Sequence, residues 1–146
     1  MKAVTIRCRA LMVGDWCCDQ HGFPMRVTNV GDDYAYATFE GNEGDPCEFN
    51  DKDDQPEGVE ITEDTLKQNN WEVQDYTLLP SEHYYVKDDG GNHLLWSHGI
   101  LSIWLACGEA NDGVFSDVVL PCKYVHQLQQ ALRLAGLSEI ADNFKV

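Results

Sequence analysis

The second half of the chain is divided into short strand-like segments by turns of a few residues, and these turns restrict the possible folds strongly. The clearest turns are Asp88-Asp89-Gly90-Gly91-Asn92 and Gly108-Glu109-Ala110-Asn111-Asp112-Gly113. A parallel pair of strands needs a crossover of about a dozen residues or more, and these links are too short for one. The pattern therefore predicts an antiparallel meander with strands at residues 71–78, 83–87, 93–96, 100–107 and 114–120.

Alternating apolar residues mark the first third of the chain as β structure too. The turn Gly31-Asp32-Asp33 is typical of a hairpin, and a polar loop follows at 41–58. We expect the first 58 residues to form an SH3-like small β-barrel or a meander that carries this acidic loop. Its strands are predicted at residues 10–17, 22–30 and 34–39. Aromatic side chains are expected to pack in the core or on the sheets: Trp16, Trp71, Trp96, Trp104, Tyr84 and Tyr85.

Two helices are expected among these strands. Thr62 suits an N-cap, acidic residues follow it in the first turn, and Asn69-Asn70 suits the helix end. A second helix is predicted at 124–135, where apolar residues recur on one face before a glycine. The fold class is therefore α+β. We expect an SH3-like unit at 1–58 and an α+β unit at 59–146, packed together as one compact body.

Negative charge is concentrated in one stretch of the chain. The net charge at neutral pH is −15, and residues 31–64 hold thirteen acidic residues against only Lys52. Such a surface opposes non-specific binding of nucleic acid and of anionic membranes, because both require lysine and arginine. We expect no direct nucleic-acid or membrane partner. The predicted loop offers a candidate acidic interaction face: Asp45, Glu48, Asp51, Asp53 and Asp54.

The start of the chain and its cysteines favour a cytoplasmic protein. Arg7 and Arg9 interrupt the first apolar stretch before the core of a signal peptide forms. No apolar run approaches the roughly 20 residues that span a bilayer. Thiols stay reduced in the cytoplasm, and no C-x₂-C pair suggests zinc. We therefore expect structural thiols and no cofactor: Cys8, Cys17, Cys18, Cys47, Cys107 and Cys122.

The sharpest polar cluster opens the second predicted helix. It comprises Tyr124, His126, Gln127 and Gln129. A functional interpretation makes His126 a ligand or a general base, whereas a structural one has it fix the docking of the helix on the adjacent sheet. General-base catalysis needs a partner within hydrogen-bond reach, and none is evident from the sequence. No catalytic residue is therefore assigned.

Two other groups of residues invite a metal interpretation. His83 and His93 would form half a metal site if they were cross-strand neighbours, with His98 nearby, although hairpin histidines are more often ordinary surface residues. The run Asp51-Lys52-Asp53-Asp54 suggests calcium, but the glycine and glutamate of a calcium-binding loop are absent at the required spacing. No metal ligand is assigned from either group.

Three segments carry a family resemblance. They are Val59-Glu60-Ile61-Thr62-Glu63-Asp64-Thr65-Leu66-Lys67-Gln68-Asn69-Asn70-Trp71, which is the most specific, Lys123-Tyr124-Val125-His126-Gln127-Leu128-Gln129-Gln130-Ala131-Leu132 and Arg9-Ala10-Leu11-Met12-Val13-Gly14-Asp15-Trp16. In this order they resemble the "I-x-L-T-E-E-x-L-x-x-x-G-F", "Y-V-H-Q-L-Q" and "L-R-x-G-N-x-V" elements of uncharacterised small proteins of gut Bacteroidetes, often encoded in prophages and mobile elements. Asn70-Trp71 replaces the Gly-Phe of that pattern. The resemblance implies a fold and a genomic setting, not a reaction.

Three hypotheses of function follow. The first is a non-enzymatic protein-interaction module whose acidic segment binds a basic protein partner, since opposite charges steer association. The second is a nucleic-acid mimic that inhibits a host DNA-binding protein, which requires carboxylates in a rigid array. The third is a small metal-dependent enzyme centred on His126 with a carboxylate or Cys122.

Overall fold

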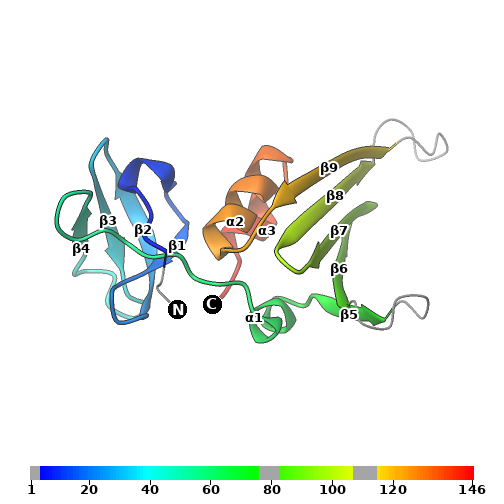
Figure 1. The fold of residues 1–146 in the computed structure, drawn as a ribbon, viewed down its shortest axis with the longest axis horizontal. Coiled ribbons are helices and arrows are strands. Elements are labelled where there is room, and N and C mark those ends of the chain that lie inside the picture. Colours follow the sequence, from blue (N-terminus) through cyan, green and yellow to red (C-terminus); the bar gives the residue numbers. More distant parts are fainter. Residues whose placement is uncertain (1–3, 76–82, 107–114) are drawn as a thin grey trace. The chain divides into compact units, whose positions relative to one another are not determined.

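Two compact units make up the chain (Figure 1). The structure is a computed structural model that describes residues 4–75, 83–106 and 115–146. Unit 1 comprises Met1–Glu60 with Tyr124–Phe144 and Val146, and unit 2 comprises Ile61–Lys123 with Lys145. The first division lies two residues from the predicted one at 58/59. The later part of the chain differs, because residues 124–144 belong to the same unit as the first 60 residues.

Unit 1 contains a four-stranded antiparallel sheet. Its strands are β1 (Trp16–Cys18), β2 (Pro24–Val30), β3 (Tyr34–Thr38) and β4 (Cys47–Asn50), in the order β1-β2-β3-β4. A short 3₁₀ helix, η1 (Cys8–Ala10), precedes them. The strands form an open meander, so the closed-barrel alternative is wrong, while an SH3-like arrangement stays a prediction.

Residues 41–58 were predicted to form one continuous loop, and this prediction is wrong because the segment contains strand β4. Phe49 of β4 is buried at 3% exposure and lies opposite Ala35 of β3. A single large apolar side chain among polar neighbours is too short an alternation to be recognised as a strand. Burial of that one side chain anchors the segment to the sheet.

The core of unit 1 is built from small and medium apolar side chains. Its members are Ile6, Cys8, Leu11, Cys17, Met25, Val27, Ala35, Ala37 and Phe49. Cys18 is buried beside Cys17, although the side chains of adjacent strand residues point to opposite faces of the sheet. Burial raises the pKa of Cys17 to about 12. Thiols of this kind stay protonated and act as small apolar side chains, as predicted.

Helices α2 (Val125–Leu134) and α3 (Ser138–Asp142) complete unit 1. The predicted apolar face of α2 is confirmed, with Val125, Leu128 and Leu132 fully buried. Gly136 ends α2 with φ +81°, and the amide of Leu137 donates to the carbonyl of Leu132. Helix α3 was not predicted, so the described residues contain three α-helices where two were expected.

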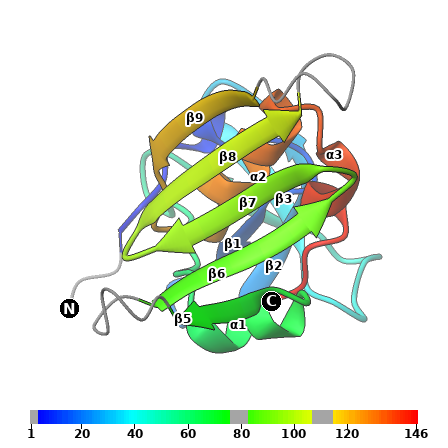
Figure 2. The same ribbon diagram turned by 90° about the vertical axis from the view of Figure 1, so that its right-hand side faces the viewer.

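The described residues of unit 2 form a five-stranded antiparallel meander and one helix (Figure 2). Its elements are α1 (Glu63–Gln68), β5 (Glu72–Asp75), β6 (His83–Asp89), β7 (Asn92–Ser97), β8 (Ile100–Ala106) and β9 (Phe115–Pro121). Consecutive strands are neighbours throughout, which confirms the predicted meander. One face of this sheet carries buried apolar side chains, namely Tyr85, Leu94, Leu101 and Ile103.

Helix α1 begins and ends where the sequence predicts. The Thr62 side chain accepts a hydrogen bond of 3.2 Å from the amide of Thr65, and Asn70 adopts φ +66° after the last turn. The Asn69 side chain bonds the backbone of Lys145 in both directions, at 2.7 and 2.8 Å. Trp71 follows at 2% exposure, which confirms it as a buried anchor. No helix in the described ranges is long and apolar enough to cross a membrane.

Candidate functional site

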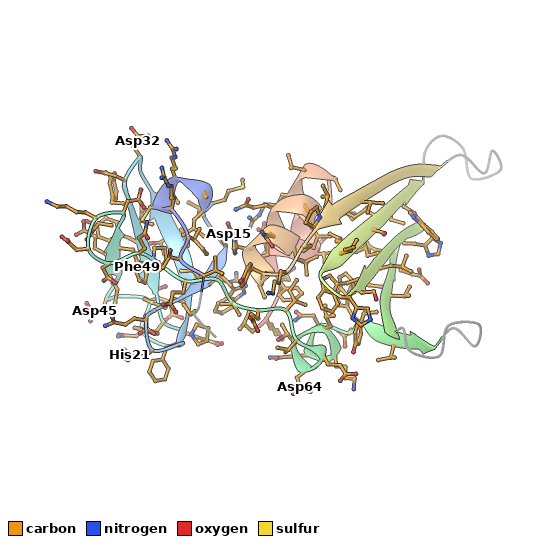
Figure 3. All side chains as sticks on the ribbon, viewed as in Figure 1. Asp15, His21, Asp32, Asp45, Phe49 and Asp64 are labelled. Atoms are coloured by element: carbon orange, nitrogen blue, oxygen red, sulfur yellow. The ribbon has the colours of Figure 1, made fainter. Side chains whose placement is uncertain are left out.

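The predicted acidic face lies on β4 and the turns at its two ends. Asp45 ends the segment before β4, Glu48 stands on β4 opposite Tyr36, and Asp53 and Asp54 follow in the next turn. All four side chains are exposed, whereas Asp51 is half-buried. We call these five residues the acidic β4 surface. Figure 3 shows Asp45 directed away from the sheet and Phe49 directed into it.

The turn after β4 is ordered by the side chain of Asn50. Its Oδ1 accepts from the amides of Lys52 at 3.1 Å and Asp53 at 2.7 Å. The amide of Asn50 donates to the carbonyl of Asp54 at 3.0 Å, which closes the turn. Asparagine is suited to such turns because its side chain replaces a backbone acceptor. The Asp53 and Asp54 carboxylates are therefore held on a defined backbone.

Asp51 performs a structural role within this surface. Its Oδ1 accepts a hydrogen bond of 2.8 Å from the amide of Cys8, and its own amide donates to the carbonyl of Asp33. The bond from the Cys8 amide lowers the pKa of the Asp51 carboxyl below its usual range, because it favours the charged form. Asp51 thus ties the β4 turn to η1, and its carboxylate is less available to a partner than the other four.

Further carboxylates extend this negative region of unit 1. Exposed acidic side chains on the neighbouring turns are Asp32, Asp33, Glu40 and Glu43. The amide of Gly41 donates to Glu43 Oε1 at 3.0 Å and lowers the pKa of that carboxyl. Figure 3 shows Asp32 and Asp45 on the outside of unit 1. Among the described residues no group of histidine, cysteine and carboxylate side chains is arranged to hold a metal ion.

Strand β4 is an edge of its sheet. It pairs with β3 on one side, and on the other side the described chain adds only the bridge between Asn50 and Asp54. The backbone groups of Asn50 face outward to Asp54, and those of alternate strand residues face the same side, so the amide and carbonyl of Glu48 also face outward and can bond another strand. Charged side chains on an edge strand prevent pairing with most other edges and favour a partner of opposite charge.

The Tyr124 and His126 cluster is largely internal. Tyr124 packs over Gly58 so closely that a Cβ added there would lie 2.6 Å from the tyrosine ring. The ring stacks on His126 with centroids 6.0 Å apart, and His126 is buried at 8% exposure. The side chain of Gln127 accepts from the amide of Tyr124 at 3.1 Å, at the first turn of α2. These contacts match the structural interpretation of the motif, in which it fixes how α2 docks.

Protonation of His126 is expected to destabilise unit 1. Burial lowers the pKa of its imidazole, and Asp15 opposes this shift only in part. The unfolded chain takes up the proton below about pH 6.5 while the folded chain resists it. Stability is therefore full above that pH and falls as the pH drops from about 6.5 toward the folded pKa, by at most about 1.4 kcal/mol per pH unit.

This pH dependence is measured by urea unfolding of wild type and His126→Leu at about pH 7.5 and about pH 5.5. The indole N–H signal of Trp16 reports on unit 1, because it donates to the carbonyl of Phe144 at 2.7 Å. The comparison of the two proteins removes every contribution to stability that the substitution leaves unchanged. We expect His126→Leu to lose less stability on acidification. Equal losses in the two proteins would contradict the assignment.

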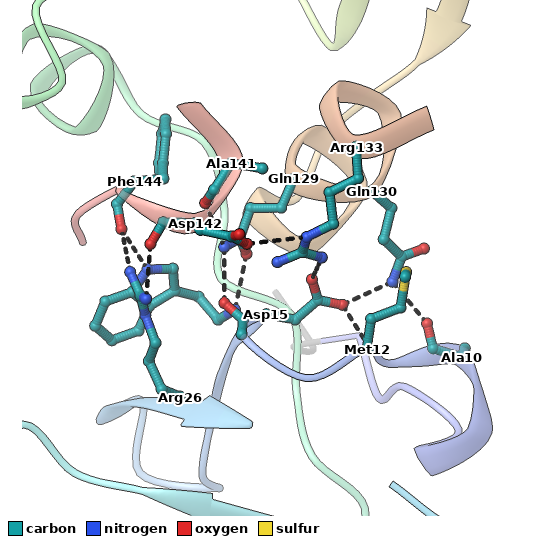
Figure 4. Close-up of polar contacts among 12 residues, drawn as sticks. Ala10, Met12, Asp15, Arg26, Gln129, Gln130, Arg133, Ala141, Asp142 and Phe144 are labelled. Atoms are coloured by element: carbon teal, nitrogen blue, oxygen red, sulfur yellow. Dashed lines mark hydrogen bonds and ion pairs between the residues drawn. The ribbon is translucent and has the colours of Figure 1, made fainter. Parts of the chain in front are cut away.

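Gln129 is a structural residue with no exposed surface. Its Oε1 accepts from the amide of Trp16 at 2.8 Å, and its Nε2 donates to the carbonyls of Gly14 at 2.9 Å and Ala141 at 3.0 Å. One amide side chain thus joins the start of β1, helix α2 and helix α3 (Figure 4). Gln129 was predicted as part of a motif with a functional or a structural role, and its contacts are those of a buried connector between these elements.

An ion pair missed from the sequence lies next to Gln129. Asp15 is fully buried and forms a close ion pair with Arg133 of α2. Its second oxygen accepts from the amide of Met12 at 2.8 Å and from Gln130 Nε2 at 2.7 Å. Arg133 Nε also donates to Asp142 at 3.2 Å (Figure 4). We call Asp15, Gln129, Gln130 and Arg133 the buried polar network.

Arg26 extends these contacts at the end of the chain. Its guanidinium donates to the carbonyls of Asp142 at 2.8 Å and Phe144 at 2.7 Å. The same group lies 4.7 Å from the centre of the Trp16 ring, a cation–π distance. Two features of the sequence are consistent with the Asp15–Arg133 pair described above. Asp15 follows Gly14 in a break between apolar residues, and Arg133 is the only lysine or arginine of α2.

The remaining sequence candidates do not assemble into a site. Burial raises the pKa of Cys122 to about 12, which is opposite to the lowered pKa of a reactive thiol. His83 pairs with Asp75 in register and His93 with Asp88, so the two histidines are not cross-strand neighbours. Nδ1 of His93 lies 2.5 Å from the Asp88 carboxylate. Cys107 lies outside the described residues.

Among the predicted site residues, only Asp45, Glu48, Asp53 and Asp54 are exposed, and all four belong to the acidic β4 surface. The residues of the Tyr124 to Gln129 cluster are buried or half-buried and contribute to the packing of α2. Comparisons of this chain with protein-family models, with curated proteins and with solved structures give no match.

Proposed function

We propose that this protein is a non-enzymatic interaction module that binds a basic protein partner through the acidic β4 surface. The family resemblance suggests an accessory role in a prophage or mobile element as its setting. One observation carries the proposal: Asp45, Glu48, Asp53 and Asp54 are exposed on an ordered edge strand and its turns, with Lys52 as the only cation in residues 31–64.

Two physical properties of this surface support a basic partner. Concentrated negative charge speeds the encounter with a positively charged protein, and the effect weakens as salt screens it. The free edge of β4 can also pair with an extended segment through backbone hydrogen bonds, which supply affinity without depending on side-chain sequence. A basic, extended segment meets both properties.

The nucleic-acid mimic is a second candidate, because hydrogen bonds fix the turn after β4 within the 41–58 segment. A mimic needs carboxylates on a fixed scaffold, and the hydrogen bonds of Asn50 and Asp51 supply one for the turn after β4. Under this hypothesis the basic partner is a DNA-binding protein. Competition with duplex DNA separates the two candidates, since only a partner that uses its DNA-binding surface is displaced.

The test compares two variants of equal charge change. In the first, Asp45→Asn, Glu48→Gln, Asp53→Asn and Asp54→Asn neutralise the acidic β4 surface but leave Asp51 in place. In the control, Glu60→Gln, Asp64→Asn, Asp89→Asn and Glu139→Gln neutralise four exposed acids elsewhere. We expect the first variant to bind an oligo-lysine peptide about tenfold more weakly at low salt, and the control to bind like wild type.

Partners from cells that encode the protein are then captured on wild type and both variants at low salt. A basic protein retained by wild type and by the control, but lost from the first variant and released by salt, supports the proposal. Equal retention on all three proteins, or no basic protein retained at all, overturns it.

A further inference from the structure

The five-stranded sheet of unit 2 has apolar side chains on both faces. Neighbouring strands place Val86, Leu95, Ser102 and Val119 in one cross-strand row. Because side chains alternate along a strand, Ile100 and Trp104 of β8 stand on the same face as Ser102. The buried side chains of the sheet lie on the opposite face: Tyr85, Leu94, Leu101 and Ile103.

The second face is open to solvent. Val119 is 59% exposed, Ile100 51% and Trp104 41%, while Val86 on β6 and Leu95 on β7 are half-buried. Figure 2 looks onto the broad face of this sheet. The solvent side of an antiparallel sheet normally carries polar residues. Trp104 was expected to pack in the core or on a sheet, and it lies on a sheet face in contact with His93 and not in the core. We call Val86, Leu95, Ile100, Trp104 and Val119 the open apolar face.

The described Asp, Glu, Lys and Arg side chains on this face are all acidic. Glu72 pairs in register with Val86, and Asp88 stands opposite His93 in the next row. The His93 ring also contacts Trp104 edge-on, with centroids 6.2 Å apart. Lys87 stands on the other face, where its Nζ donates to the carbonyl of Asn69. On the described part of this face there is thus no lysine or arginine beside the exposed apolar side chains.

We propose that the open apolar face binds a segment of another protein that combines aliphatic side chains with lysine or arginine. The aliphatic side chains cover Ile100, Trp104 and Val119, and the cations meet Glu72 and Asp88 at the border. Exposed apolar patches rimmed by polar residues mark interaction sites. This surface lies in unit 2 and is separate from the acidic β4 surface of unit 1, so either proposal can fail without the other.

A second copy of the chain fits this face poorly. Self-association would bring Glu72 and Asp88 of one molecule toward the carboxylates of another, with no cation of the described face to compensate. The net charge of −15 adds repulsion at long range. A basic partner removes both costs, and this charge argument selects it as the occupant.

The test titrates the ¹⁵N-labelled full chain with a synthetic peptide that has leucine at helix positions i, i+3, i+4 and i+7 and lysine elsewhere. We expect shifts of the Trp104 indole N–H and of β7 to β9 amides. Two control peptides replace every leucine with serine or every lysine with glutamate. Val119→Lys and Ile100→Lys should each weaken binding about tenfold. Leu134→Lys, a matched change at a 90% exposed leucine of unit 1, should leave it unchanged.

Three outcomes overturn the proposal. In the first, the leucine–glutamate peptide binds as tightly, so charge does not select the partner. In the second, the lysine peptides shift only residues 45–54, so binding belongs to the acidic β4 surface. In the third, the protein alone shows concentration-dependent shifts on β8 and β9 and sediments as a dimer, so a second copy covers the face.

Discussion

Replacing Asp15 with alanine is expected to lower the free energy of unfolding of unit 1 by about 3 kcal/mol or more. The carboxylate is fully buried and pairs with Arg133, so its removal leaves a largely buried guanidinium that retains only the 3.2 Å contact with Asp142. The amide of Met12 and the side chain of Gln130 lose an acceptor at the same time. Urea unfolding followed by the Trp16 indole signal measures the change.

A double-mutant cycle separates the ion pair from general loss of packing. Arg133→Met removes the cation, and the double variant removes both charges together. We expect the double variant to be more stable than Asp15→Ala alone, because no unpaired buried charge remains. The assignment fails if Asp15→Ala costs less than about 1 kcal/mol, the size of an exposed pair, or if the two single effects simply add.

Gln129→Met is expected to destabilise unit 1 by about 3 kcal/mol, although methionine has nearly the same size. The amide of Trp16 and the carbonyls of Gly14 and Ala141 would lose their partners in a buried setting, and each unpaired group costs about 1–3 kcal/mol. Hydrogen exchange of the Trp16 amide should speed up, since its acceptor is removed.

The matched control is Gln20→Met in the exposed turn between β1 and β2. It makes the same chemical change without burying a new unpaired group, and we expect its stability to lie within about 0.5 kcal/mol of wild type. If Gln129→Met is as stable as this control, the prediction is wrong. The three hydrogen bonds of Gln129 would then add little to the free energy of unfolding, because water bonds the same groups equally well in the unfolded chain.

The elements that the sequence predicted well carry local signals. Thr62 caps the start of α1, and Asn70 follows its last turn with a positive φ. Gly136 ends α2 through its positive φ. The short turns of unit 2 exclude parallel pairing, so the meander order followed directly. Each of these signals acts over a few residues, where backbone geometry and capping decide the outcome.

The predictions that failed concern elements whose evidence lies elsewhere in the chain. Strand β4 exists because Phe49 is buried against Ala35, and its own segment is almost entirely polar. The same is true of the site: the exposed carboxylates were recognisable from charge alone, whereas the structural use of Asp51 depends on the amide of Cys8, 43 residues away.

The sequence by itself determined the strands of unit 2, helices α1 and α2, and the concentration of charge in residues 31–64. Only the tertiary structure decided that Asp15 and Arg133, 118 residues apart, form a buried pair, and that Trp104 stands on the open face of its sheet. Secondary structure follows from short-range periodicity, which a sequence displays directly. The pairing of distant polar groups and the choice of which sheet face is covered depend on burial, and burial is a property of the folded chain.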